Sequence, residues 1–169
     1  GNQAILRGGR VRTVPTAGVV ALRLLIAGAG GATPERPAKP ADAPFFEGKS
    51  PKSRLFVCPQ TGDDTTGTGA EDRPFATLQA AAVMVGPGQG IRLGKGKHKT
   101  GLAIGGLRGT ETEPIWIEGE PGTQATFEGG SQGLHFSRCA YLVVRNISVT
   151  DCSTNGINCD DGGDYGNET

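Results

Sequence analysis

The spacing of apolar and polar residues changes along this chain near residue 90. Before that point, one segment repeats apolar residues at three- and four-residue spacing, at Phe75, Leu78, Ala82 and Val83. This spacing is typical of one face of an α-helix. Pro74 stands where such a helix would begin, and the Gly-Pro-Gly of residues 86–88 would end it. The pattern predicts one short amphipathic helix.

After residue 90 the chain alternates short apolar strands with glycine-rich turns. The predicted strands are residues 91–93, 115–117, 125–127, 134–136, 141–149 and 157–159. Another apolar strand, residues 54–57, marks the expected start of the folded domain. No second helical pattern lies between the strands, which excludes a fold that alternates strands with helices.

The strands recur at a nearly constant interval. Ile91, Ile115, Leu134 and Ile157 follow one another after 24, 19 and 23 residues. Repeats of this length are typical of solenoids, in which stacked coils bury a continuous core. A β-sandwich would have longer strands joined by hairpins. We therefore expect an all-β solenoid.

The first 53 residues have a different composition. Residues 1–32 combine arginines with an apolar run and end in small residues, so they are either an export signal or spurious sequence upstream of the true start. Residues 33–53 are rich in proline and predict an extended linker. Phe45 and Phe46 are its large apolar pair, and we expect them to pack on the following domain. An export signal would place the protein in the periplasm, at the cell surface or outside the cell.

The charge of the chain limits its partners. Seventeen Lys and Arg balance seventeen Asp and Glu, which gives no electrostatic reason to expect binding to nucleic acid. No run of about 20 uncharged apolar residues predicts a membrane span. Glycine accounts for 29 of the 169 residues, which disfavours a helical bundle.

Three segments together resemble a known superfamily. The first is RPFATLQAAAVMVGPGQGIRLGKGKHK; the later ones are EPIWIEGEPGTQATFEGG and YLVVRNISVTDCSTNGINCDDGGDY. They are similar to the cap helix and successive coils of right-handed parallel β-helix proteins of the pectate-lyase-like superfamily. The resemblance implies that residues 54–169 are the N-terminal part of such a domain, truncated after about three coils. The longer protein is expected to be a monomer.

One feature departs from the family pattern. Related sequences place an aromatic residue after the glycine in the strand that follows the helix, whereas Lys97, His98 and Lys99 follow Gly96 here. We therefore expect the first coil to be exposed or irregular.

The acidic turn near the end of the sequence is the strongest candidate site. Asp160, Asp161 and Asp164 lie within five residues, and clustered carboxylates repel one another unless a cation or a basic group neutralises them. Ca²⁺ prefers several oxygen ligands of this kind. The alternative is a solvated turn, because Asp and Gly suit turn geometry. The spacing resembles the calcium motif of family 9 pectate lyases, which implies that the three carboxylates are Ca²⁺ ligands.

The same resemblance implies a reaction. In these enzymes Ca²⁺ binds the carboxylate of a uronate and acidifies the C5 proton, which a lysine removes. The matching lysine would lie beyond Thr169, and the coil before Asp160 offers Ser137 and Arg138 where the family has a fourth Asp. We expect a protein that binds an acidic polysaccharide and cleaves it by Ca²⁺-assisted β-elimination. The alternatives are a non-catalytic surface or adhesin-like β-helix and a polygalacturonase-like hydrolase.

Other polar and aromatic residues are weaker candidates. A basic cluster could contact an anionic sugar but is better explained as a solvated edge; it consists of Lys95, Lys97, His98 and Lys99. His135 alternates with apolar neighbours and is expected at the surface. Trp116 either offers a face for sugar stacking or, as we favour, packs on the linker or a neighbouring turn.

The four cysteines lack the spacing of a zinc site. We expect them to be buried free thiols, although one disulfide is conceivable. Asn146 is expected either to form a turn or to stack on other asparagines between strands.

Overall fold

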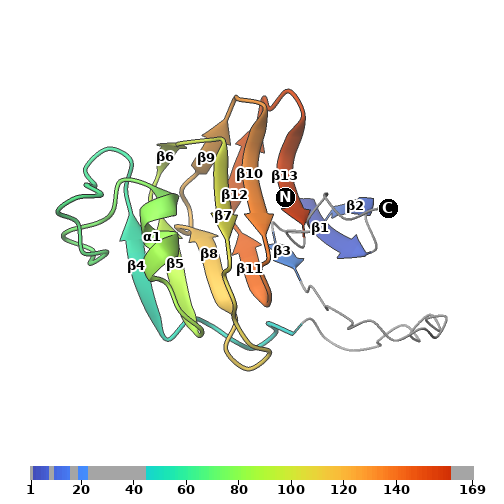
Figure 1. Cartoon of the computed structure of the whole chain (residues 1–169), viewed down its shortest axis with the longest axis horizontal. Helices are drawn as coiled ribbons and strands as arrows, with labels where there is room; N and C mark the ends of the chain where they lie inside the picture. Colours follow the sequence, from blue (N-terminus) through green and yellow to red (C-terminus); the bar gives the residue numbers. More distant parts are fainter. Residues whose placement is uncertain (1, 8–9, 16–18, 23–44, 161–169) are drawn as a thin grey trace, which may run out of the picture.

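Three sheets, whose strands are parallel from coil to coil, run along the axis of a solenoid (Figure 1). The computed structural model describes the backbone of residues 2–7, 10–15 and 19–22 and the whole of residues 45–160. Within this part, three successive coils each contribute one strand to each sheet. The coils are β5-β6-β7, β8-β9-β10 and β11-β12-β13. The chain is an all-β parallel solenoid, a β-helix, as the sequence predicted.

The strands are short, as the spacing of the turns requires. The first sheet contains β4 (Ser53–Val57), β5 (Gln89–Leu93), β8 (Ile115–Gly119) and β11 (Leu142–Arg145). The second contains β6 (Gly96–His98), β9 (Ala125–Glu128) and β12 (Ile147–Thr150). The third contains β7 (Leu102–Gly105), β10 (Gln132–Ser137) and β13 (Asn155–Asp160). The sequence pattern missed β6 and β7: β6 has only His98 facing the core, and β7 is a short strand in which Leu102 and Ile104 are the two inward residues.

Three further strands extend the first sheet beyond β11. They are β1 (Asn2–Arg7), β2 (Arg10–Pro15) and β3 (Val19–Leu22). β3 pairs antiparallel with β11 and parallel with β1, and β1 pairs antiparallel with β2. Much of the expected signal (1–32) and linker (33–53) lies outside the described residues, so those two assignments stay predictions.

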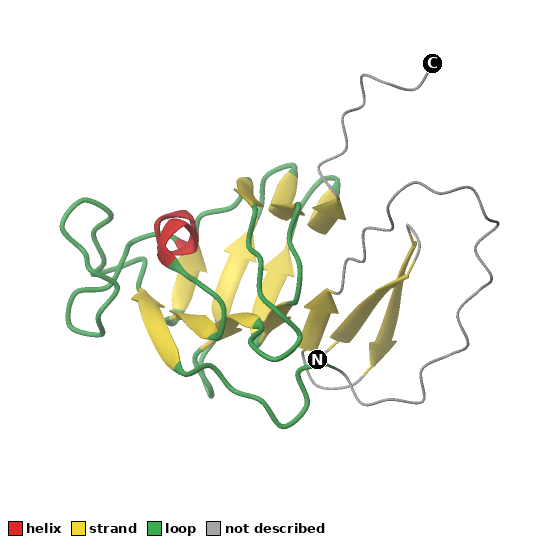
Figure 2. Cartoon of the chain, turned by 60° about the horizontal axis from the view of Figure 1, so that its bottom comes forward, coloured by secondary structure: helices red, strands yellow, loops and turns green. Residues whose placement is uncertain are grey.

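The helix α1 (Leu78–Met84) packs against β4, β5 and β7 at one end of the solenoid (Figure 2). Thr77 is its N-cap: the hydroxyl oxygen accepts a hydrogen bond from the backbone N–H of Ala80. The carboxylate of Asp64 in turn accepts hydrogen bonds from the backbone N–H groups of Ala76 and Thr77 and from the Thr77 hydroxyl. The helix is where the pattern predicted it, and it occupies the position expected of a cap.

Two details of the helix prediction were wrong. The helix begins four residues after Pro74, because the cap is supplied by Thr77 and Asp64 rather than by proline. Val83 is 81% exposed, and Met84 beside it is also exposed. The inward face is instead formed by Leu78 and Ala81.

The core consists of apolar side chains that stack from coil to coil. Leu102, Leu134 and Ile157 occupy equivalent positions in the third sheet, so the predicted 23-residue step from Leu134 to Ile157 is confirmed. The step from Ile91 to Ile115 joins β5 and β8, which do stack, but it is two residues out of register, because Ile91 pairs with Ile117. The step from Ile115 to Leu134 joins strands of two different sheets, so that prediction was wrong. Coils of unequal length explain both differences.

A sharp turn at Asn146 separates β11 from β12. Its φ of 55° is left-handed, a conformation that asparagine tolerates better than most residues. The single strand predicted over residues 141–149 is therefore two strands in two different sheets, joined by a turn at Asn146, the first of its two expected roles. Gly119 lies against this turn: a Cβ there would be 1.9 Å from the Asn146 carbonyl oxygen.

His98 belongs to the core rather than to a basic surface cluster. It is 3% exposed, its ring stacks on Phe127 at 5.2 Å, and its Nε2 lies 2.8 Å from the carbonyl oxygen of Gly94. Burial lowers the pKa of His98. The first coil is thus regular, because the imidazole fills the inward position that an aromatic residue was expected to occupy.

All four cysteines are free, and Cys139 is buried, in agreement with the sequence. Cys58, Cys152 and Cys159 are only partly buried. Within the described residues, no helix is long and apolar enough to cross a membrane.

We predict that Gly119→Ala destabilises the fold by about 2 kcal/mol or more, because the methyl group would meet backbone that cannot move without breaking the Asn146 turn. Urea denaturation measures the effect. Gly86→Ala is the matched control, since a Cβ there meets only the end of the Gln89 side chain at 3.5 Å. Equal stability of the two variants would contradict the close packing of the coils.

We predict that the free energy of unfolding falls as the pH drops below about 6.5, the unfolded-state pKa of histidine. Because the folded-state pKa of His98 is lower, the unfolded chain takes up the proton first and is favoured in acid. Urea denaturation at pH 7.5 and at pH 5 measures this loss. In His98→Phe the loss of stability between pH 7.5 and pH 5 should be smaller than in the wild type. The other histidine, His135, is unchanged in this variant. An unchanged pH dependence in this variant would be evidence against a neutral buried His98.

Candidate functional site

Asp160 ends β13 on the outer face of the third sheet. Ile157 and Cys159 pack against the core, so the alternating residues Asn158 and Asp160 point outward. Asp160 pairs in register with Ser137 of β10, and Asn158 pairs with His135. Four polar residues from two coils therefore form one group on the outer face.

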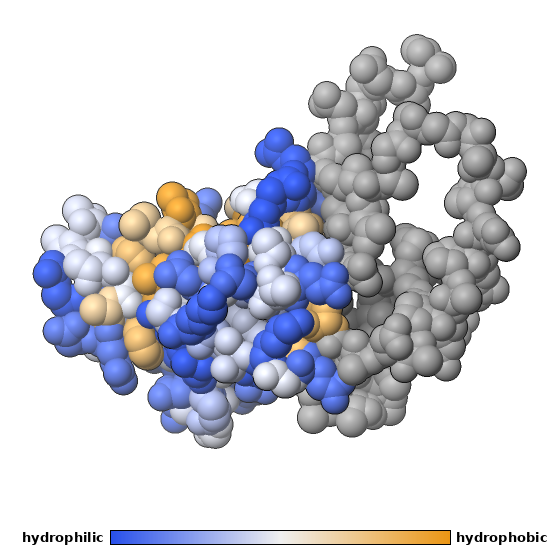
Figure 3. All heavy atoms as spheres, turned by 90° about the horizontal axis from the view of Figure 1, so that it is seen from below, coloured by the Kyte–Doolittle hydropathy of each residue, from blue (hydrophilic) through white to orange (hydrophobic). Residues whose placement is uncertain are grey.

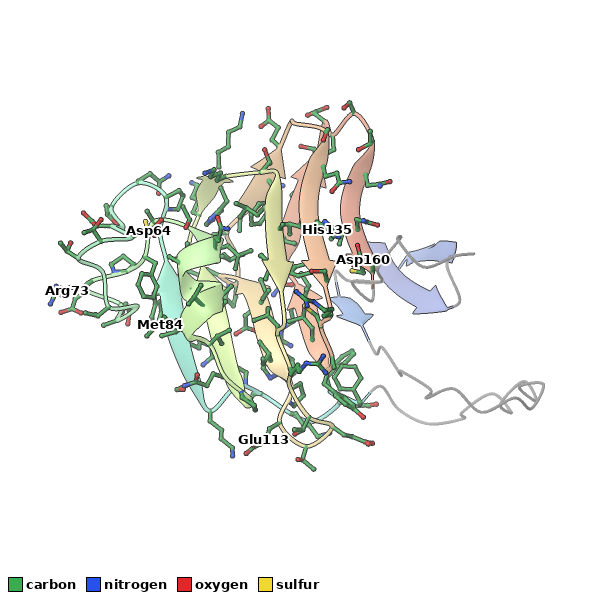
Figure 4. The ribbon with its side chains drawn as sticks, viewed as in Figure 1. Asp64, Arg73, Met84, Glu113, His135 and Asp160 are labelled. Atoms are coloured by element: carbon green, nitrogen blue, oxygen red, sulfur yellow. The ribbon has the colours of Figure 1, made fainter. Side chains whose placement is uncertain are left out.

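His135 and Asp160 interact directly across the two strands (Figure 4). The imidazole Nε2 is hydrogen-bonded to the Asp160 carboxylate, and the side chains of both residues are between a quarter and a third exposed. The prediction that His135 points away from the core is confirmed. It is, however, half-buried and paired with a carboxylate rather than simply solvated. This pairing depends on the register between coils, which the sequence pattern does not indicate.

The described residues supply only part of the predicted calcium site. Asp161 and Asp164 lie outside them, and no group of three or more Asp, Glu, His or Cys side chains within residues 45–160 is arranged to hold a metal ion. Asp160 is the one predicted ligand that is described. The equivalent position in the preceding coil is Ser137, as the sequence indicated, so no second carboxylate comes from there. Burial raises the pKa of the neighbouring Cys159 thiol to about 12, which makes this thiol a poor metal ligand.

A second group of charged residues, which the sequence analysis missed, lies on the outer face of the first sheet. Glu118 of β8 is buried beneath three arginines that come from β4, β5 and β11. We call Arg54, Arg92 and Arg145 the arginine cluster. Arg54 Nε and Arg92 Nη2 each lie 2.9 Å from Glu118 Oε1. Arg145 binds Glu118 Oε2 through Nε at 2.8 Å and Nη2 at 2.6 Å.

The register of the strands explains this arrangement. Glu118 pairs in register with Arg92 on one side and with Arg145 on the other. The same outward position therefore carries a positive, a negative and a positive charge in three successive coils. Arg54 reaches Glu118 from the edge strand β4, where it pairs with Gly90. The outward positions of the strands were readable from the sequence, but the register that aligns them was not.

Glu118 remains ionised in this setting. Burial by itself raises the pKa of its carboxyl, but hydrogen bonds from Arg54 and Arg145 and the charges of the arginines outweigh burial, so the pKa is lowered. The carboxylate therefore holds together three guanidinium groups that would otherwise repel one another.

Trp116 lies beside this cluster and is 1% exposed, so it offers no free face for stacking on a sugar. The ring of Phe46 packs edge-on against it at 6.3 Å, and Phe45 packs in the same way on Tyr141 at 5.6 Å. The favoured prediction, that Trp116 packs on the expected linker or a neighbouring turn rather than presenting a face to a sugar, is confirmed by the contact with Phe46. The Arg145 guanidinium lies 4.8 Å from the centroid of the Trp116 ring.

The predicted basic cluster around residues 95–99 does not form as a unit. His98 is buried, as described above, and Lys97 pairs with Glu128 at 3.2 Å. Lys95 and Lys99 are exposed. This edge therefore matches the solvated alternative rather than a sugar-binding site.

No protein-family model matches the sequence, and no curated protein matches it. Among solved structures, the chain is similar to the crystal structure of pectate lyase Pel9A, with a TM-score of 0.49 and 22% sequence identity. The similarity covers 60% of this chain and 29% of that chain, so the sequence corresponds to less than a third of the length of that protein. The assignment of the fold rests on the parallel pairing of the strands themselves.

We predict that Glu118→Ala lowers the free energy of unfolding by about 3 kcal/mol, because three half-buried arginines lose their shared partner. The lowered pKa means that the Glu118 contribution is complete above about pH 4.5 and is lost as the pH falls below that value. Urea denaturation between pH 7 and pH 3 measures both effects. Glu113→Ala, which removes an exposed carboxylate paired with Lys52, is the control. Equal losses in the two variants would show that Glu118 does not hold the cluster together.

Proposed function

We propose that this protein binds an acidic polysaccharide and that Asp160, with Asp161 and Asp164, holds a Ca²⁺ ion that bridges to the polymer. The observation that carries the proposal is the position of Asp160. Its carboxylate points outward at the end of β13, in a polar group with His135, Ser137 and Asn158, and directly before Asp161. Carboxylate, hydroxyl and amide oxygens are the ligands that Ca²⁺ takes in proteins.

His135 has a positioning role in this proposal. Its hydrogen bond fixes the Asp160 carboxylate on the outer face before any ligand arrives. Ser137 and Asn158 add hydroxyl and amide groups that can hydrogen-bond to sugar hydroxyls on the same face.

Cleavage by β-elimination is the further step of the proposal. A bound Ca²⁺ ion would stabilise the negative charge that develops on the uronate when its C5 proton leaves. The proposal assigns no residue as the base that removes this proton. The competing function is binding without cleavage, which the pairing of Asp160 with His135 also accommodates.

The test incubates the full-length protein with pectate, alginate and a glycosaminoglycan, in Ca²⁺ or in chelator. The ultraviolet absorbance of unsaturated uronate reports elimination, a reducing-end assay reports hydrolysis, and calorimetry reports Ca²⁺ and polymer binding. We predict a Ca²⁺-dependent rise in absorbance with one of these polymers. We also predict that Asp160→Asn weakens Ca²⁺ binding about 10-fold or more.

Asp151→Asn is the matched control. Asp151 is exposed in the turn after β12, and its φ of 56° suits asparagine. Polymer binding without new absorbance or reducing ends would identify a non-catalytic binder. Reducing ends without absorbance would identify a hydrolase. Full Ca²⁺ affinity in Asp160→Asn would exclude the site.

A further inference from the structure

We propose that the arginine cluster is a second, metal-independent site, which binds one carboxylate or sulfate group of the acidic polysaccharide. The identity of the polymer rests on the function proposed above, whereas the anion site rests on the cluster alone. The cluster lies on the first sheet and Asp160 lies on the third, so the two sites use different faces of the solenoid.

The charge of the cluster is not balanced. Three guanidinium groups share the single carboxylate of Glu118, which leaves an excess of two positive charges. Among residues 45–160, no other Asp or Glu lies within ion-pair distance of these arginines. Like charges held this close repel one another, and a bound anion would relieve the repulsion.

The arginines also have hydrogen-bond donors to spare. Each guanidinium carries five N–H donors, and the bonds to Glu118 use one nitrogen of Arg54, one of Arg92 and two of Arg145. The side chain of Glu118 is 2% exposed, whereas those of Arg54 and Arg145 are 31% and 30% exposed. Solvent therefore reaches the arginines and not the carboxylate beneath them. An incoming oxyanion meets donors and positive charge.

The cluster is held in place before a ligand binds. Glu118 draws the three side chains together, and the guanidinium of Arg145 lies over the Trp116 ring, against which Phe46 packs edge-on. Such preorganisation reduces the conformational entropy that the long arginine side chains lose when a ligand binds. Planar guanidinium groups suit carboxylate and sulfate, which accept two parallel hydrogen bonds.

The wider surface favours a discrete anionic group over a nucleic acid. The whole chain is neutral, with 17 basic and 17 acidic residues, so it has no broad positive field of the kind that attracts a phosphate backbone. In the view from below, the described part shows mainly hydrophilic residues, with the hydrophobic ones in small separate groups (Figure 3). A local excess of positive charge on a neutral chain fits a sugar polymer that carries spaced carboxylates.

The test measures two ligands by titration calorimetry in chelator, so that Ca²⁺ plays no part. The ligands are inorganic sulfate, which reports the anion site alone, and oligogalacturonate, which reports the polymer. Arg54→Gln should weaken both about 10-fold, because a charge-assisted hydrogen bond is lost. Arg54 lies on the edge strand β4 and is the most exposed of the three arginines, so this variant disturbs packing least.

Glu118→Gln provides a test in the opposite direction. It keeps the size of the side chain but removes the competing negative charge, so binding of both ligands should strengthen about 10-fold. Lys97→Gln removes one positive charge from the second sheet and should leave both affinities unchanged. Circular dichroism confirms that each variant is folded.

The outcomes separate the two proposals. Sulfate affinity that is equal in the wild type, Arg54→Gln and Glu118→Gln would overturn the anion site. If the variants change the affinity for sulfate but not the affinity for oligogalacturonate, the assignment of the polymer to this site is overturned. No oligogalacturonate binding in chelator, with sulfate still responding to the cluster, would refute the polymer as the ligand of this site and leave a site for small oxyanions. The Ca²⁺-dependent function proposed above fails separately, if none of the three polymers binds in Ca²⁺.

Discussion

Every feature of this molecule depends on parallel backbone pairing between successive coils. A parallel ladder places one residue of each coil directly above its counterpart in the coil before. Inward positions then build a continuous core, such as the stack of Leu102, Leu134 and Ile157. Outward positions are aligned by the same ladder, so side chains that are about 25 residues apart in sequence become neighbours. Core and surface sites are therefore two consequences of one register.

The two charged groups show what this alignment produces on different sheets. On the third sheet, one histidine and one carboxylate meet at an outer corner and are both partly open to water. On the first sheet, one carboxylate is buried under three arginines. A buried carboxylate without partners would be costly, whereas here the arginines keep Glu118 ionised and Glu118 keeps the arginines together. The two groups therefore differ in burial and in charge balance, although the same ladder produces both.

The ends of the solenoid need other interactions, because an open coil exposes its core and its backbone groups. At one end the helix α1 covers β4, β5 and β7, and the carboxylate of Asp64 ties the loop before it to the helix N-terminus. Along the first sheet, Phe45 and Phe46 cover Tyr141 and Trp116. Inside the core, His98 stacks on Phe127 and fills a position where an apolar aromatic residue was expected.

The sequence by itself determined the class of fold, the cap helix, most strands and the burial of Trp116 against neighbouring residues. These follow from local periodicity, from turn-forming residues and from the burial of large apolar groups. Only the tertiary structure decided which strands stack, because coils of unequal length hide the register. For that reason Glu118 with its arginines, the pairing of His135 with Asp160 and the buried position of His98 could not be read from the sequence. Each depends on a contact between coils rather than on any local pattern.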